Sequence, residues 1–275
     1  TIDLAGTWAG RPGFLVCGGP SLRDHMLLDH LKKPGVVSVG VNNAAAYART
    51  TAATFGDPQW KFHDSLFLDP KVMVFAPTAK LIRRPRRKMP DGTFRFLDIH
   101  IGDCPSVYGL PRTGKFDSKT FFTDAYAHWG KGGKQPEREF TRLASMLLGV
   151  RLLYYLGCPR VYMLGVDFWS TNEKAYAWNE GRSGGNGNWW KIDRMLDGIR
   201  EEGEKRGFTM YNLNPDSYCK AFETRTCLEA VGDTLQEMPQ SYPPDLNEYY
   251  SHRRMDEDRA KHPEPLPVMT LKPDP

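Results

Sequence analysis

The stretch FLVCGGPSL, residues 14–22, joins an apolar run typical of a buried strand to a turn rich in glycine. Pro20 and Ser21 favour a helix that starts at the end of this turn, capped by the serine hydroxyl. Glycines let a backbone approach a ligand closely, and the first amides of a helix attract an anion. The stretch therefore predicts a phosphate contact at Gly18, Gly19 and Ser21, with an ordinary structural turn as the alternative.

The rest of the chain repeats the order of strand and helix. Apolar runs at 37–41, 53–55, 72–75 and 161–166, and the segment FTMYNL at 208–213, predict strands, while helical spacing predicts helices at 137–156 and 190–206. This alternation indicates an α/β fold, a Rossmann-like and mostly parallel sheet with helices on both faces. We expect one nucleotide-binding domain over 1–239, with a lid at about 168–189, and an extended, charged, proline-rich tail over 240–275.

Composition excludes several classes of protein. The 275 residues are 40% hydrophobic and 25% charged, enough for a substantial core, and no apolar run approaches the ~18 residues of a membrane-spanning helix. The first residues lack the pattern of a secretion signal. Five cysteines without a C-x-x-C pair favour buried thiols in a reducing compartment over disulfides or zinc. We therefore expect a protein of the cytoplasm, in a bacterium or a virus-infected host cell.

Positive charge is concentrated in KLIRRPRRKMPDGTFR, residues 80–95, which has a net charge of +6 against +4 for the whole chain. Such density suits phosphate backbones, and aromatic residues elsewhere could stack on a base or a sugar ring. A solvated surface or a site for an acidic glycan would explain the charge equally well. The candidate acceptor-binding residues are Arg83, Arg84, Arg86, Arg87 and Lys88.

Polar residues directly follow other predicted strands. Asn42 and Asn43 come after 37–41, Asp57 follows the next strand, and Asp167 follows 161–166. Because parallel sheets bind ligands outside the carboxyl ends of their strands, we expect these side chains to share one edge with the glycine turn. Each could instead only cap a helix or brace a loop. Neither G-x-G-x-x-G nor G-x-x-x-x-G-K-[ST] occurs.

Six segments in order carry a resemblance: LVCGGPSL (15–22), GVNNAAAY (40–47), ATFGDP (53–58), YLGCPRVYMLGVDFW (155–169), AYAW (175–178) and YNLNPDS (211–217). Together they resemble the bacterial sialyltransferases of glycosyltransferase family 42 and the related DUF115 and flagellin-glycosylation proteins. The resemblance implies that Gly19 and Ser21 lie against the phosphate of a nucleotide sugar and that Asn42 contacts this donor.

The same resemblance implies further roles. Asp57 replaces a donor-contacting Asn, and Ser145 lies near the donor. Tyr176 binds the leaving phosphate, and Trp169 stands where a second such tyrosine would be. Two departures matter: the lid lacks the histidine that serves these enzymes as general base, and Cys17 fills a position that is usually glycine.

Sugar transfer requires a group that holds the departing phosphate and a base that deprotonates the acceptor hydroxyl. The one Asp-x-Asp spacing, Asp256 to Asp258, lies in the charged tail, so we expect transfer without a metal ion. Phosphate contacts are expected from Tyr176 and from Arg182 or Lys191. The candidate bases are Asp167 and Asp57, followed by His128 and Glu180.

The sequence thus predicts a metal-independent glycosyltransferase that uses a nucleotide-sugar donor and no other cofactor. Its acceptor would be a hydroxyl group, on a hydroxymethylated base in DNA or on a glycan. Two alternatives stay open: a Mg²⁺-dependent pyrophosphokinase of the pterin type, which DUF115 domains also resemble, and a non-catalytic nucleic-acid-binding protein on a degenerate transferase fold.

Overall fold

The computed structural model describes residues 3–23, 25–113, 116–124, 127–128, 145–168, 177 and 189–237. Most of the predicted lid and the whole predicted tail therefore lie outside the described residues.

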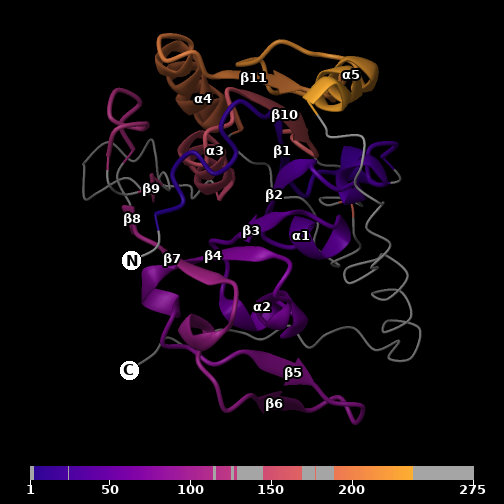
Figure 1. Ribbon diagram of the computed structural model, residues 1–275, viewed down its shortest axis with the longest axis vertical. Coiled ribbons are helices and arrows are strands. Elements are labelled where there is room, and N and C mark those ends of the chain that lie inside the picture. The colour runs from indigo at the N-terminus through magenta and orange to yellow at the C-terminus, as the bar shows by residue number, and fades with distance from the viewer. Residues whose placement is uncertain are drawn as a thin grey trace.

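A seven-stranded sheet forms the centre of the molecule (Figure 1), and all of its neighbouring strands are parallel. The order across the sheet is β11-β10-β1-β2-β3-β4-β7. The buried, β-branched composition of the central strands explains why both of their faces are covered. The strands are β1 (Gly13–Val16), β2 (Val37–Val41), β3 (Ala52–Thr54), β4 (Met73–Pro77), β7 (Val107–Leu110), β10 (Arg160–Leu164) and β11 (Thr209–Asn212).

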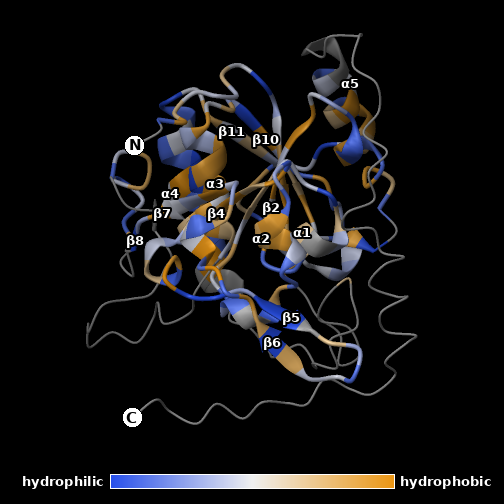
Figure 2. Cartoon of the chain, turned by 60° about the horizontal axis from the view of Figure 1, so that its bottom comes forward, coloured by the Kyte–Doolittle hydropathy of each residue, from blue (hydrophilic) through white to orange (hydrophobic). Residues whose placement is uncertain are grey.

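Helices cover both faces of this sheet, as the sequence predicts. On one face lie α3 (Met146–Tyr155) and α4 (Trp189–Glu204), and on the other lie α1 (Ala44–Tyr47), α2 (Ser65–Leu68) and α5 (Cys227–Glu237), as Figures 1 and 2 show. Alternate residues of β1 serve the two sides: Leu15 packs with the α3 and α4 side, and Phe14 and Val16 pack with the α5 side. This is the two-residue period of a strand that is buried on both faces.

The order of the strands reverses next to β1. From β1 the chain proceeds through β2, β3 and β4 to β7 in one direction, whereas β10 and β11 lie on the other side of β1. A crevice at such a reversal, outside the carboxyl ends of the strands, is the usual place of a ligand in an open α/β sheet. The carboxyl ends of β1 and β10 therefore mark the candidate site.

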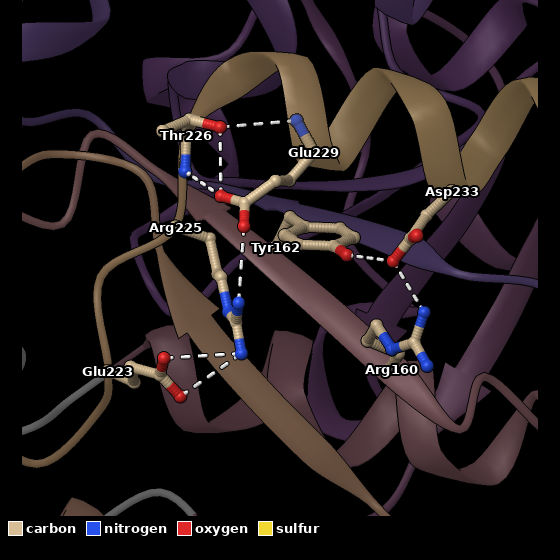
Figure 3. Close-up of polar contacts among 7 residues, drawn as sticks. All are labelled: Arg160, Tyr162, Glu223, Arg225, Thr226, Glu229 and Asp233. Carbon is tan, nitrogen blue, oxygen red and sulfur yellow. Dashed lines mark hydrogen bonds and ion pairs between the residues drawn. The ribbon is translucent and has the colours of Figure 1, made fainter.

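The last described helix, α5, is fixed to the sheet by polar contacts (Figure 3). Asp233 of α5 accepts hydrogen bonds from Arg160 and from the hydroxyl of Tyr162, both on β10. A reciprocal capping box starts the helix: the Thr226 amide donates to Glu229 Oε2 at 2.7 Å, and the Glu229 amide donates to Thr226 Oγ1 at 3.2 Å. The sequence analysis missed this helix, although the T-x-x-E spacing is its sequence signal.

The basic segment forms a separate two-stranded antiparallel hairpin, β5 (Arg86–Lys88) and β6 (Phe94–Phe96). Figure 2 shows it outside the sheet, with hydrophilic and hydrophobic residues mixed. A second small pair consists of β8 (Arg112–Thr113) and β9 (Ala127–His128). The sequence analysis predicted neither pair, because strands this short lack a readable period.

One prediction is wrong in a way that affects the site. The helix expected to start at Ser21 is a single 3-10 turn, Pro20–Leu22, with no side-chain cap hydrogen bond. The backbone is extended again at Arg23, where φ is −63° and ψ is 127°. One turn aligns too few peptide dipoles to act as the anion-binding helix end that the sequence suggested. The predicted helix at 137–156 is described only as α3, and its first eight residues lie outside the described part.

Candidate functional site at the carboxyl edge of the sheet

Asp167 joins the two loops at the strand reversal. Its carboxylate accepts hydrogen bonds from the Ser21 amide (2.8 Å), from the Ser21 hydroxyl and from Asn214 Nδ2 (2.8 Å). The residue is only 2% exposed, so these bonds compensate the cost of burying the carboxylate. The turn after β1 is thus bound to a carboxylate of the protein itself.

The backbone amides of this turn also donate within the protein. Gly19 donates to the carbonyl of Gly165 at 2.9 Å, and Leu22 donates to the carbonyl of Gly19 at 3.0 Å. A Cβ on Gly19 would lie 2.5 Å from Asp167 Oδ2 and 2.6 Å from the Gly165 carbonyl. Gly19 is therefore required for the approach of the two loops, and a larger residue there would disturb the loop as well as any ligand.

The loop after β11 completes this arrangement. Ser217 Oγ donates to the carbonyl of Val166 at 2.6 Å, and the Tyr218 amide donates to the carbonyl of Asp167 at 2.8 Å. Asn214 and Ser217 belong to the segment YNLNPDS that carries part of the resemblance, but no pattern in the sequence connects them with Asp167. Their signal is position, since both follow the strand that neighbours β10.

Burial and charge make the thiol at this turn unreactive. Desolvation, followed by the negative charge of Asp167, raises the pKa of Cys17 to about 12. A thiol with so high a pKa is protonated at neutral pH and is a poor nucleophile. Cys17 therefore contributes packing to the site.

Of the predicted lid, Phe168, Ala177 and Trp189 are described, and Ala177 lies on the turn after β1. The Ala177 amide donates to the carbonyl of Gly18 at 3.0 Å, and Arg23 Nε donates to the carbonyl of Ala177 at 2.9 Å. Ala177 is 1% exposed. Tyr176 and Trp169, which the resemblance places at the leaving phosphate, lie outside the described residues, as do Glu180 and Arg182.

Asn42 connects the ends of β2 and β3. Its Oδ1 accepts hydrogen bonds from the amides of Gly56 (3.0 Å) and Asp57 (3.4 Å), and its own φ is 54°, a left-handed value that asparagine tolerates better than most residues. Asn43 is the N-cap residue of α1. Their roles in donor binding stay predictions, while the structure gives both a local role in shaping the edge.

Ser145 is the N-cap residue of α3 and is partly buried. α3 runs antiparallel to the strands: a Cβ on Gly149 would meet Leu15 and Val41 near the strand ends, whereas Leu153 lies against Gly13 at the start of β1. The N-terminus of α3 thus faces the carboxyl edge, and the place of Ser145 near a donor stays a prediction.

The other half of the edge is basic. Asp57 Oδ2 forms an ion pair with Lys61 Nζ at 3.0 Å, and Lys80 Nζ donates to the carbonyl of Gly56 at 2.9 Å and to the carbonyl of Asp57. Burial, then the positive charge of Arg112, lower the pKa of Lys80 to about 8. The sequence analysis missed Lys61 and Arg112, and counted Lys80 only as part of the basic segment.

The basic residues of the hairpin have different surroundings. Arg87 binds the fully buried carboxylate of Asp64 through Nε (2.7 Å) and Nη2 (2.6 Å), so it anchors the hairpin to the start of α2. The Arg86 guanidinium lies 3.6 Å from the ring centroid of Phe94. Arg84 forms an ion pair with Asp98 at 3.3 Å, and Arg83 is exposed. The predicted block is thus not a uniform cationic surface.

Three further predicted residues are only partly described. His128 lies in β9, Lys191 in α4 and Lys88 in β5, but their side chains are outside the described part. Within the described ranges, no cluster of three or more His, Cys, Asp or Glu side chains could hold a metal ion. No helix in the same ranges combines the length and the apolar character needed to cross a membrane.

No family model and no curated protein matches this sequence. Among solved structures, the sialyltransferase CstII from Campylobacter jejuni, in complex with a substrate analogue, cytidine-5'-monophosphate, matches with a TM-score of 0.44 and 11% sequence identity. The match covers 92% of this chain and 98% of that chain. At this identity no residue role carries over from that enzyme to this chain.

Proposed function

We propose that this protein is a glycosyltransferase that moves a sugar from a nucleotide-sugar donor to a hydroxyl acceptor without a metal ion. The observation that carries the proposal is the contact of Ala177 with the turn after β1, at the reversal of strand order. We infer that the residues next to Ala177 in the sequence would exclude water from a nucleotide bound at the usual ligand position of the fold. Tyr176, adjacent to Ala177 in the sequence, is the proposed contact of the leaving phosphate.

Asp57 is the general base that we propose. Asp167 accepts three hydrogen bonds and is 2% exposed, so its lone pairs are engaged and an acceptor hydroxyl has little access to it. The Asp57 side chain is 41% exposed and pairs with Lys61 through Oδ2. An accessible carboxylate with a free approach to one oxygen suits proton abstraction better than an enclosed one.

We propose that the hairpin, with Arg83 just before it, binds a negatively charged acceptor. Arg83 and Arg95 are exposed there, and the rings of Phe94 and Phe96 are 38% and 59% exposed. Exposed rings beside cations suit stacking on bases with contacts to phosphates. DNA that carries a hydroxymethylated base is the acceptor we propose, and an acidic glycan is the outcome to compare in the test.

The first experiment is a thermal-shift panel of CMP-, UDP-, GDP- and ADP-sugars and ATP, each in EDTA and in Mg²⁺. A ligand that binds only the folded state raises the melting temperature by mass action. Stabilisation by one nucleotide sugar in EDTA supports the proposal and identifies the donor. Stabilisation by ATP with Mg²⁺ alone would favour the pyrophosphokinase, and the absence of any shift would favour the non-catalytic binding protein.

A second experiment tests the base once the donor is known. Asp57→Asn should lower kcat by at least about 100-fold, the usual contribution of a general base, while the donor still raises the melting temperature. Comparing hydroxymethylated DNA with an acidic glycan as acceptors identifies the substrate. Unaltered turnover in Asp57→Asn would exclude this residue as the base.

A further inference from the structure

A cleft opens at the amino ends of β10 and β11, at the opposite end of these strands from the candidate site. Its volume is about 410 Å³, within the range of small-molecule sites. Residues 157–159, directly before β10, and 206–208, directly before β11, line it together with the last turns of α3. The described lining includes none of the residues assigned above to the candidate site.

Aromatic side chains from separate segments of the chain form one wall of this cleft. The ring centroid of Phe122 lies 4.5 Å from that of Tyr154 and 5.4 Å from that of Phe208, and the other two centroids are 5.5 Å apart. Phe122 and Phe208 are almost completely buried. Tyr154 is partly exposed, and Tyr155, which also lines the cleft, is 37% exposed. The packed rings therefore give the cleft a rigid apolar wall.

The guanidinium group of Arg151 has unsatisfied hydrogen-bond donors at the cleft. The residue is partly exposed and lines the cleft, and its Nη2 donates to the carbonyl of Asp124 at 3.0 Å. Its Nε and Nη1 are buried and have no hydrogen-bond partner within the described part of the chain. Burial lowers the pKa of Arg151, and the charge of Asp124 opposes this effect only in part. A ligand that supplied an acceptor would remove the cost of leaving a charged donor without a partner.

A second guanidinium group, that of Arg206, lines the cleft from the loop between α4 and β11. Its side chain is exposed, and its charge acts on Glu202, which is already paired with Lys205 at 2.6 Å. None of the described lining residues is acidic. Guanidinium groups form strong, charge-assisted hydrogen bonds with carboxylates and phosphates. The lining thus suits a ligand that combines an anionic group with a flat apolar ring.

We propose that this cleft is a second binding site of the protein, for a small molecule that carries a carboxylate or a phosphate on a planar ring system. Arg151 binds the anionic group, Arg206 adds a second positive charge, and the tyrosine rings contact the planar part. The site goes beyond the proposed sugar transfer and does not rest on it. An occupant there leaves the candidate donor site at the carboxyl edge free.

Two fluorescent probes that differ by one anionic group test the site without any assay of transfer. Anilinonaphthalene sulfonate carries a sulfonate on its rings, and phenylnaphthylamine is its uncharged counterpart. Fluorescence titration measures the dissociation constant of each probe for the wild type, Arg151→Met and Arg206→Met. Lys71→Met is the matched control, because exposed Lys71 precedes β4, four strands away from β10 in the sheet.

We expect the dissociation constant of the anionic probe to rise at least about 10-fold in Arg151→Met, the loss typical of a hydrogen bond to a charged group. In Arg206→Met, whose cation is exposed, it should rise about 3-fold. Lys71→Met should bind the anionic probe as the wild type does, and the uncharged probe should bind all four proteins alike.

Equal affinity of the anionic probe for all four proteins would overturn the proposal, as would an equal loss of both probes in the arginine variants. If Arg151→Met fails to fold, Arg206→Met decides the test, because its exposed position tolerates the change. The melting-temperature shift caused by a nucleotide sugar should be the same in Arg206→Met and in the wild type, so failure of the proposed transfer and failure of this site are measured in different experiments.

Two displacing ligands distinguish the sources of the anionic group. Displacement of the arginine-dependent probe by a nucleoside monophosphate assigns the cleft to a phosphate ligand, and displacement by benzoate assigns it to an aromatic carboxylate. Failure of both to displace the probe would overturn the proposed class of ligand.

Discussion

At the ends of β1 and β10, Asp167 accepts hydrogen bonds from Ser21 and Asn214 and is almost completely buried. At the ends of β3 and β4, Lys61 pairs with the partly exposed carboxylate of Asp57, and Lys80 donates to the backbone carbonyls of Gly56 and Asp57. Polar groups that form hydrogen bonds with one another fix the positions of loops, whereas a partly exposed charge can still attract a ligand of opposite charge. The comparison therefore separates a buried half of the edge, whose polar groups satisfy one another, from a half whose charged side chains are partly exposed.

The largest expected effect contrasts the two aspartates. Asp167→Asn should lower the free energy of unfolding by about 3 kcal/mol, because an amide nitrogen would face the donors of Ser21 or Asn214 in a buried position. Asp57→Asn should cost less than about 1 kcal/mol, because its ion pair is partly exposed. Urea unfolding followed by tryptophan fluorescence measures both. Equal losses would contradict the division into two halves.

The hairpin provides the next contrast. Arg87→Ala should destabilise the protein by about 2 kcal/mol, because it leaves the fully buried carboxylate of Asp64 without its strongest partner. Arg83→Ala should leave the urea midpoint unchanged and, if the hairpin binds DNA, reduce the salt slope of binding by about 1. A stability loss in Arg83→Ala, or none in Arg87→Ala, would show that the anchor lies elsewhere.

A smaller effect is expected at Asn42, which connects the two halves. Asn42→Gly keeps the left-handed φ but removes the acceptor of the Gly56 and Asp57 amides, at a cost of about 1 kcal/mol. Asn42→Ala should cost more, because alanine adds strain at this φ. Identical values for the two variants would mean that strain plays no part.

The last expected effect is a pH dependence from Lys80. Its pKa is about 8 in the folded protein against the ordinary 10.5, so between these values the unfolded chain binds more protons than the folded one. Lys80 therefore makes stability rise with pH across this window. Urea unfolding at pH 7.5, 9 and 10.5 should reveal this rise as a difference between the wild type and Lys80→Met, and parallel curves would refute it. Lys71→Met is the control.

The sequence predicted the strands of the sheet well because their apolar, β-branched runs are long enough to read. The segments 37–41 and 161–166 correspond closely to β2 and β10, and the predicted helix at 190–206 corresponds to α4 (Trp189–Glu204). Other elements escaped: β7 is partly exposed and interrupted by Gly109, and the hairpin strands are charged and largely exposed, so neither has the continuous apolar run of a buried strand.

The candidate site also has a part that the sequence predicted and a part that it did not predict. The residues after each strand could be predicted to share one edge, because parallel strands place all of their carboxyl ends together. Asn42 and Asp57 follow the neighbouring strands β2 and β3, and Asp167 follows β10 on the other side of β1. Which of these side chains stays accessible to a ligand, and which is enclosed by hydrogen bonds, could not be predicted. The Ser21 amide, expected to face a phosphate, donates to Asp167 across 146 residues of sequence.

By itself, then, the sequence determined a parallel α/β sheet and the edge at which polar residues gather, since both follow from local periodicity and from the direction of the strands. The tertiary structure alone decided which charges neutralise one another. Asp167 meets Ser21, Arg87 meets Asp64, and Lys80 lies near Arg112 only because strands and loops distant in the chain become neighbours. Electrostatic balance depends on distances in space, which the order of residues does not contain.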